Sequence, residues 1–161
     1  MVRFAIIQLS LFVVLVACAA TIKGVVTRVR DGDTIQLLDS DGVRYKVRLA
    51  KIDAPESKQE WGQEATEMLR GLVSNKMVRI VWDKFDRYRR IIGVVYVDNV
   101  EINLTMVATG NAWHYKAFDS SQAYVEAEKS ARENRLGLWA GLDVISPQDW
   151  RRRRRLRAHK D

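Results

Sequence analysis

The sequence predicts an α+β fold in which a small, partly open barrel of five short strands is packed against about three α-helices. Short segments in which apolar and polar residues alternate recur through the first two thirds of the chain and are separated by turn residues. Apolar residues at helical spacing occur after the third of these segments and again towards the C-terminus. At 161 residues, 47% of them hydrophobic, the chain is long enough for one domain with a sizeable core.

The first three predicted strands form a meander. An opening strand over residues 21–29 ends at the Asp31-Gly32 turn, and a second strand runs from Thr34 to Leu38. The turn residues 39–42 lead to a third strand, 43–49, in which Val43, Tyr45, Val47 and Leu49 alternate with Arg44, Lys46 and Arg48. This third strand therefore buries one face and turns a cationic face the other way.

A helix and two further strands follow. The helix is indicated by apolar residues at helical spacing from Ala65 to Val73. Its start has two interpretations: Ser57 and Glu60 fit a capping box, whereas Gly62 weakens that first turn and favours entry at Trp61-Gly62. Residues 77–82 and 91–97 are the fourth and fifth strands, and a basic loop with aromatic residues joins them.

The C-terminal third predicts helices. Asn103 is the expected cap of a short helix that ends at Gly110, and Asp119 or Ser121 opens a longer one. Residues 136–139 form a hydrophobic latch, and residues 146–161 form a basic, disordered tail. The OB-fold matches this order of elements best, although the architecture alone indicates only a binding module.

The N-terminus predicts export. Residues 1–20 contain one basic residue and then an apolar run that ends in small residues, as in a secretory signal peptide. The run falls slightly short of the roughly 20 residues of a membrane-spanning helix, so an uncleaved anchor is the weaker alternative. Cys18 fits either a lipoprotein signal, in which it carries a lipid anchor, or a cleavage site. The mature protein is then secreted or periplasmic and has no disulfide.

The positive charge is concentrated at the C-terminus. The net charge is +7, yet residues 21–150 hold as many Lys and Arg as Asp and Glu, whereas residues 151–161 are strongly basic. The tail therefore predicts contact with a polyanion, either a nucleic acid or an anionic membrane surface. A solvated tail that only aids solubility is the alternative.

Acidic residues gather at the ends of two predicted strands. Asp33 precedes the second strand, and Asp53 and Glu56 follow the third strand around Pro55, which holds the chain extended. Carboxylates from two strand ends can converge on one hard cation, and Arg48 beside them suits an anion. The constellation predicts a metal-assisted phosphodiester site.

Four motifs in this order resemble a staphylococcal nuclease homologue, a member of the thermonuclease family. They are Asp31-Gly32-Asp33-Thr34, then Arg48 followed by Asp53-Ala54-Pro55-Glu56, then the pattern of Asp86, Tyr88 and Arg90, and finally Leu136-Gly137-Leu138-Trp139. The resemblance covers roughly residues 23–139 and places a nuclease domain at 21–145. It implies a five-stranded OB barrel and Ca²⁺-dependent hydrolysis of DNA and RNA that leaves 3′-phosphate ends.

The resemblance also implies a role for individual residues. Asp33 and Asp53 would bind Ca²⁺ directly, with the main-chain carbonyl of Ala54 as a third ligand, a position where many members have Thr. Glu56 would lie beside the attacking water, as a general base or as an acceptor that orients the water. Arg48 and Arg90 would hold the scissile phosphate.

Further predictions concern Arg89 and the residues around position 114. The family usually has Gly just before the second catalytic arginine, where this chain has Arg89, which would be strained at positive φ. Spacing assigns the catalytic role to Arg90, and a role shared with Arg89 is the alternative. Of the aromatic residues near position 114, Tyr115 is expected to stack on a nucleobase and Trp113 to lie in the core. Lys116 is expected to contact phosphate, and His114 has no catalytic role.

These observations predict an exported, monomeric, calcium-dependent nuclease with little sequence specificity. The alternative is a noncatalytic OB-fold module that binds nucleic acid. The presence of every acidic residue and arginine that the family requires favours the enzyme. The sequence leaves the preference between DNA and RNA open.

Overall fold

A computed structural model describes residues 20–158 of the chain. The predicted signal peptide, apart from its last residue, and the candidate lipidation site Cys18 lie outside these residues. Among the residues described, no helix is both long enough and apolar enough to span a membrane.

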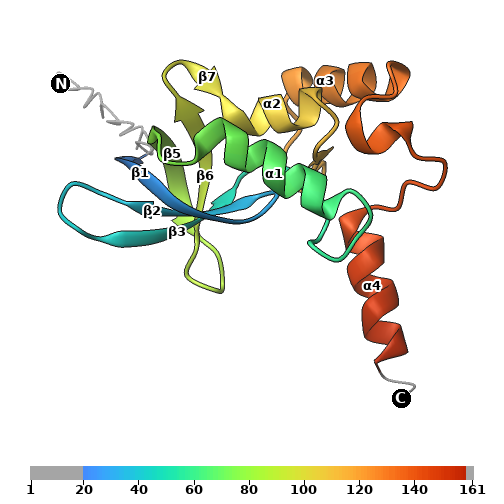
Figure 1. The fold of residues 1–161 in the computed structure, drawn as a ribbon, viewed down its shortest axis with the longest axis horizontal. Helices are drawn as coiled ribbons and strands as arrows, with labels where there is room; N and C mark the ends of the chain where they lie inside the picture. Colours follow the sequence, from blue (N-terminus) through green and yellow to red (C-terminus); the bar gives the residue numbers. More distant parts are fainter. Residues whose placement is uncertain (1–19, 159–161) are drawn as a thin grey trace, which may run out of the picture.

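Five strands form a closed barrel (Figure 1). They are β1 (Ala20–Asp31), β2 (Thr34–Leu38), β3 (Arg44–Leu49), β5 (Met77–Phe85) and β6 (Ile91–Val97), in the spatial order β3-β2-β1-β5-β6. A parallel pairing between β3 and β6, from Val47 opposite Ile91 to Leu49 opposite Gly93, completes the barrel. The predicted α+β class and OB barrel are confirmed, and closure by this pairing leaves the barrel less open than expected.

Three short strands extend this framework. β7 (Val100–Glu101) pairs with the end of β6. β4 (Ile52–Asp53) pairs with β8 (Trp113–His114) in a separate two-stranded sheet. Because β4 contains Asp53, this pairing fixes the main chain at one of the predicted metal ligands.

The alternation of residue types explains which side of the barrel is buried. In β3, Val47 and Leu49 point into the core, whereas Arg44 and Lys46 are exposed. The same alternation in the other strands fills the interior with branched apolar side chains. The most deeply buried of these are Ile35, Leu37, Val47, Ile80, Ile91 and Val95.

The described residues hold four α-helices, where the sequence predicted about three. They are α1 (Gly62–Val73), α2 (Ile102–Ala108), α3 (Gln122–Glu133) and α4 (Pro147–Arg157), with a short 3₁₀ helix, η1 (Gly137–Ala140), before α4. α1 packs against β1, and α2 packs against α3 at one end of the barrel (Figure 1). α4 extends away from the barrel (Figure 1).

The start of α1 resolves the ambiguity left by the sequence. Trp61 is the N-cap residue and adopts a left-handed backbone with φ of 65°, so the helix enters at Trp61-Gly62 and not through a capping box at Ser57. Gly62 lies against the preceding loop so closely that a Cβ there would be 1.9 Å from the carbonyl oxygen of Glu56. Only glycine fits here, and this fit sets the position of the loop that carries Glu56.

The prediction that Asn103 caps α2 is wrong. Glu101 occupies the cap position, and Asn103 lies within the helix, fully buried. Its amide oxygen accepts a hydrogen bond from the Val95 N–H at 3.0 Å, and its Nδ2 donates to the carbonyl oxygens of Ala50 and Gly93 at 2.9 and 3.1 Å. Asn103 therefore joins the segment after β3 to β6, where the barrel closes.

The prediction of a disordered tail is also wrong over most of its length, because α4 occupies residues 147–157. Ser146 caps this helix by accepting a hydrogen bond from the Asp149 N–H at 3.1 Å and donating one to the Asp149 carboxylate at 2.8 Å. Pro147 lies at the first helical position, where its missing N–H has no consequence. These capping contacts allow an arginine-rich segment to form a helix despite its charge.

Candidate active site

The β1–β2 turn brings Asp33 against the chain segment that contains Ala54. A Cβ on Gly32 would lie 2.7 Å from the Cβ of Ala54 and 3.0 Å from that of Ala65, so this approach requires glycine. Asp33 is buried, and its Oδ2 accepts a hydrogen bond from the Ala54 N–H at 2.9 Å. Its Oδ1 accepts one from the Thr34 hydroxyl at 3.1 Å. The first predicted ligand is thus held beside the segment that carries the others.

Arg48 brings the two buried carboxylates together. Its Nη2 lies 3.0 Å from Asp33 Oδ2 and 3.0 Å from Asp53 Oδ1, and its Nη1 donates to the Leu49 carbonyl oxygen at 2.9 Å. The register of the sheet explains this position, since Arg48 on β3 pairs with Thr34 on β2, directly after Asp33. One cationic nitrogen therefore contacts both carboxylates that are predicted to bind calcium.

The acidic groups at this end of the barrel are close enough to affect one another. Burial and the neighbouring charge of Asp33 raise the pKa of Asp31 to about 6. Burial raises the pKa of Asp53 as well, with a contribution from Asp33 and against the stabilising hydrogen bond from Arg151. Raised pKa values are expected where buried carboxylates lie close together, because burial and the repulsion between like charges both disfavour the ionised form. Such groups are typical of sites that bind a cation.

Glu56 lies at the mouth of the site, with 38% of its side chain exposed. Gln59, which is buried, fixes the loop because its Oε1 accepts a hydrogen bond from the Glu56 N–H at 3.2 Å and its own N–H donates to the Glu56 carbonyl oxygen at 2.7 Å. A partly exposed carboxylate beside two buried ones is accessible to a solvent water. Its role beside the attacking water stays a prediction.

The carboxylates fit a hard divalent cation. Asp33 and Asp53 converge on a single guanidinium nitrogen of Arg48, and the main chain of Ala54 lies directly beside Asp33. Carboxylate and carbonyl oxygens are the ligands that Ca²⁺ prefers. Within residues 20–158 no group of three or more Asp, Glu, His or Cys side chains has a metal-binding arrangement. The predicted set accordingly relies on two side chains and a main-chain oxygen.

The β5–β6 loop orients Arg90. Asp86 Oδ1 accepts hydrogen bonds from the N–H groups of Tyr88 and Arg90, both at 2.9 Å, and Oδ2 accepts one from Arg90 Nε at 2.8 Å. Burial opposes ionisation of Asp86, but these hydrogen bonds outweigh it and lower its pKa below 3.8. Arg89 has φ of 59°, the positive value that the sequence predicted as a source of strain, and its side chain is exposed.

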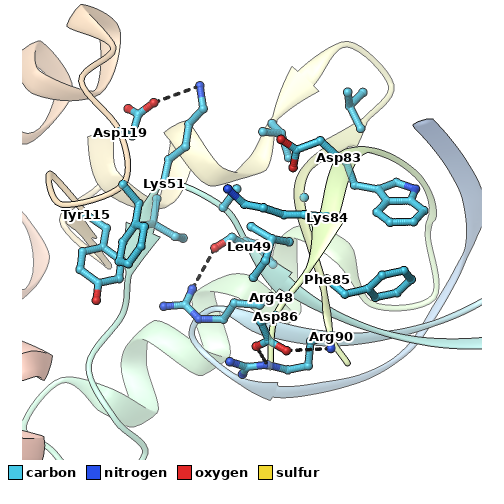
Figure 2. Close-up of a pocket in the computed structure, with 18 of the residues that line it drawn as sticks. Arg48, Leu49, Lys51, Asp83, Lys84, Phe85, Asp86, Arg90, Tyr115 and Asp119 are labelled. Atoms are coloured by element: carbon cyan, nitrogen blue, oxygen red, sulfur yellow. Dashed lines mark hydrogen bonds and ion pairs between the residues drawn. The ribbon is translucent and has the colours of Figure 1, made fainter. Parts of the chain in front are cut away.

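A pocket of about 690 Å³ lies beside the two arginines (Figure 2). Arg48 and Arg90 line one end, and aromatic side chains line its walls. Tyr115 is one of these, half-buried, with its ring packed edge to face on Phe118 at a centroid distance of 4.7 Å. The aromatic residues that line the pocket are Trp82, Phe85, Tyr88, Tyr115 and Phe118.

The other residues of the 113–116 segment lie elsewhere. Trp113 packs edge to face on Trp139 at 4.5 Å, in a small apolar cluster outside the barrel. His114 is buried with its Nε2 2.9 Å from Asp119 Oδ2, a contact that ties β8 to the start of α3. Lys116 Nζ lies 2.8 Å from Glu128 Oε2 and does not line the pocket. The structure therefore brings Tyr115, but not Lys116, to the candidate site.

Arg151 of α4 also contacts the carboxylates of the site, and the sequence analysis did not single it out. Its Nη2 lies 2.8 Å from Asp53 Oδ2, and its Nη1 lies 3.2 Å from Asp53 Oδ1 and 2.8 Å from Glu56 Oε1. Burial opposes its charge, but these hydrogen bonds raise the pKa of the guanidinium above its usual value. No local pattern marks one arginine within a run of five as a site residue.

Comparison with known proteins is consistent with this geometry. The family model described as "Staphylococcal nuclease homologue" matches residues 46–141, which include all of the site except Asp33 and Arg151. The chain belongs to this family.

Relatives of this staphylococcal nuclease homologue resemble it over most of their length. An "uncharacterized endonuclease" of Haemophilus influenzae is 40% identical over 92% of this chain and 84% of that protein. A protein of the same description from Escherichia coli is 40% identical over 84% of this chain and 88% of its own length. A "micrococcal nuclease" of Shigella flexneri is 38% identical over 92% of this chain and 91% of its own length.

The site of this staphylococcal nuclease homologue combines three chemical capacities. Buried carboxylate oxygens from Asp33 and Asp53 suit a hard cation. The guanidiniums of Arg48 and Arg90 line a pocket and can each donate two hydrogen bonds to an oxyanion. The partly exposed carboxylate of Glu56 can accept a proton or a hydrogen bond from water. Together these groups suit hydrolysis of an anionic ester.

Proposed function

We propose that this chain is an exported, calcium-dependent nuclease that acts as a monomer. It hydrolyses phosphodiester bonds of DNA and RNA with little sequence specificity and leaves 3′-phosphate ends. The observation that carries the proposal is the convergence of Asp33 and Asp53 on Arg48 at the edge of an arginine-lined and aromatic-lined pocket. Family membership and the names of the relatives, which describe those proteins as endonucleases or a micrococcal nuclease, support it.

Asp33, Asp53 and the carbonyl oxygen of Ala54 would hold the calcium ion. The ion, when bound, neutralises part of the charge on the phosphate. Arg48 and Arg90 bind the non-bridging phosphate oxygens and hold the phosphorus in line with the attacking water. Glu56 accepts the proton of that water, or orients it, as the new oxygen–phosphorus bond forms. The bond from phosphorus to the 5′ oxygen breaks, the 5′ oxygen takes a proton from solvent and leaves as a hydroxyl group, and the phosphate stays on the 3′ end.

The pocket supports low sequence specificity. Its walls present aromatic faces, among them Tyr88, Tyr115 and Phe118, and every nucleobase has a face that can stack on an aromatic ring. Unstacked bases of a single strand reach such a pocket more readily than the paired bases of a duplex. We therefore expect single-stranded substrates to be cleaved faster than duplexes.

The export part of the proposal comes from residues 1–20, whose apolar run resembles a signal peptide. After cleavage the protein would be secreted or periplasmic. The lipoprotein alternative would attach it to a membrane through Cys18. Mass spectrometry of the protein from a membrane fraction and from the medium distinguishes the two, because only lipidation adds acyl chains to Cys18.

The test of the nuclease activity uses the purified chain on single-stranded DNA and on RNA, with Ca²⁺ or with a chelator. We expect calcium-dependent cleavage that leaves 3′-phosphates, and a fall in kcat of about 10² to 10³ in Glu56→Gln and in Arg90→Ala. Arg70→Ala, at an exposed arginine of α1, is the control and should keep the wild-type rate. Tight binding without cleavage, unaffected by Ca²⁺ or by either substitution, would favour the noncatalytic binding module.

A further inference from the structure

The contact between α4 and the carboxylates of the site has no role in the proposed hydrolysis. Arg151 binds both oxygens of Asp53 and one oxygen of Glu56. Asp53 Oδ1 also accepts a hydrogen bond from Arg48 Nη2 at 3.0 Å. Both oxygens of a predicted metal ligand are thus already bound to guanidinium groups, and so is the carboxylate that is expected to contact the attacking water.

Contacts at the base of α4 hold Arg151 in this position. Gln59, which fixes the Glu56 loop, also donates a hydrogen bond from Nε2 to the carbonyl oxygen of Ile145 at 2.7 Å. Pro147 is buried, and Trp150 lines a cavity of about 340 Å³ together with Pro55 and Gln59. The first turn of α4 is therefore attached to the same loop whose carboxylate Arg151 binds.

A divalent cation and Arg151 compete for the same oxygens. A cation that takes Asp53 as a ligand removes at least one acceptor from the guanidinium and places two positive charges beside it. The side chain of Arg151 is 38% exposed, so it can move into solvent without rearrangement of the core. Its departure also leaves Glu56 Oε1 available to a water molecule.

We propose that Arg151 is an internal competitor of the metal ion. In the metal-free protein it closes the site by binding Asp53 and Glu56, and metal binding displaces it. This inference rests on the proposed function, because it takes Asp53 as a metal ligand. It predicts that the natural protein binds Ca²⁺ more weakly than its carboxylates alone would allow.

The test measures Ca²⁺ binding directly, by isothermal titration calorimetry of the purified chain without substrate. We expect Arg151→Ala to bind Ca²⁺ about tenfold more tightly, because the ion then no longer competes with the charge-assisted hydrogen bonds of a partly exposed guanidinium. Arg151→Lys should fall between the two, since an ammonium group cannot bind both oxygens of Asp53 in the way a guanidinium does. Arg153→Ala, an exposed arginine of the same helix, should bind as the wild type does.

The Ca²⁺ concentration that gives half-maximal cleavage should fall in parallel with the dissociation constant. If the wild type binds Ca²⁺ and both Arg151→Ala and Arg151→Lys bind it equally or less tightly than the wild type, Arg151 is not a competitor of the metal ion. That result would leave the nuclease proposal unaffected. Equally tight binding by the wild type and by Asp53→Asn would instead show that Asp53 is not a ligand. That result would overturn the inference together with the proposed metal site.

Discussion

The two carboxylate oxygens of Asp86 make separate contacts, so one substitution can remove one set and keep the other. Oδ1 accepts the N–H groups of Tyr88 and Arg90, whereas Oδ2 accepts only Arg90 Nε. In Asp86→Asn the amide oxygen can still hold the turn, but an NH₂ group then faces the Arg90 guanidinium. The ion pair is partly buried, with 16% of the Asp86 side chain and 26% of the Arg90 side chain exposed. Its loss should lower the free energy of unfolding by about 1 kcal/mol.

We therefore expect Asp86→Asn to lower kcat about fivefold, because Arg90 loses its orientation, and to lower the free energy of unfolding by about 1 kcal/mol. Asp86→Ala also loses two main-chain hydrogen bonds and should be destabilised by about 2 kcal/mol. Steady-state cleavage of single-stranded DNA at saturating Ca²⁺ and urea unfolding measure the two effects. Wild-type kcat in Asp86→Asn, or equal destabilisation of both variants, would refute this division between the two oxygens.

The same pair has a defined pH dependence. The folded-state pKa of Asp86 lies below its ordinary value of 3.8, so its contribution to stability is present above that value and is lost as the pH falls through the folded pKa. The stability difference between the wild type and Asp86→Asn should be constant between about pH 5 and pH 8 and should vanish in acid. A difference that changes across neutral pH would point to another titrating group.

Two further predictions concern α1 and α4. Gly62→Ala should lower kcat more than about tenfold and destabilise the protein by about 2 kcal/mol, because the new Cβ displaces the Glu56 main chain. Gly71→Ala is the control, because a Cβ at this position of the same helix meets open space, and it should stabilise the protein by about 0.5–1 kcal/mol with kcat unchanged. A wild-type kcat in Gly62→Ala would show that Gly62 does not set the position of Glu56. Changing residues 152–155 from Arg to Gln should lower the salt dependence of single-stranded DNA binding, by about 0.7 in the logarithmic slope per lost phosphate contact. Fluorescence anisotropy across a salt series measures this slope, and an unchanged slope would show that α4 does not bind the substrate.

The barrel was predictable because its signals are local. The alternation in β3 and the turns at Asp31-Gly32 and at residues 39–42 fix the bounds of β2 and β3 to within a residue. The same turns place Asp33 directly before β2 and Arg48 on the neighbouring strand β3, which is why the paired carboxylates and the arginine could be expected to meet. The closure of the barrel was less predictable, since the β3–β6 pairing is parallel and joins segments more than forty residues apart.

The errors arise where a local pattern has two explanations. Asn before an apolar stretch is typical of a helix cap, but the same residue can satisfy buried main-chain groups, as Asn103 does. The arginine run suggested disorder, although Ser146 and Asp149 already formed a capping box with Pro147 between them. The contact of Arg151 with Asp53 spans 98 residues and has no local signal.

The even charge balance of residues 21–150 has a structural origin that bears on substrate binding. Three of the cations that line the pocket each contact a carboxylate of the same chain: Arg48 contacts Asp33 and Asp53, Arg90 contacts Asp86, and Lys51 contacts Asp119 at 3.6 Å. A phosphate must compete with those carboxylates, so these pairs orient the arginines more than they attract distant polyanions. Long-range attraction then depends more on exposed cations, and the exposed arginines of α4 are the densest group of these in the described part of the chain. Gln59 of the Glu56 loop donates a hydrogen bond to Ile145 just before α4, and Arg151 of α4 contacts Glu56. A nucleic-acid strand drawn to the arginines of α4 would therefore arrive beside the carboxylates of the candidate site.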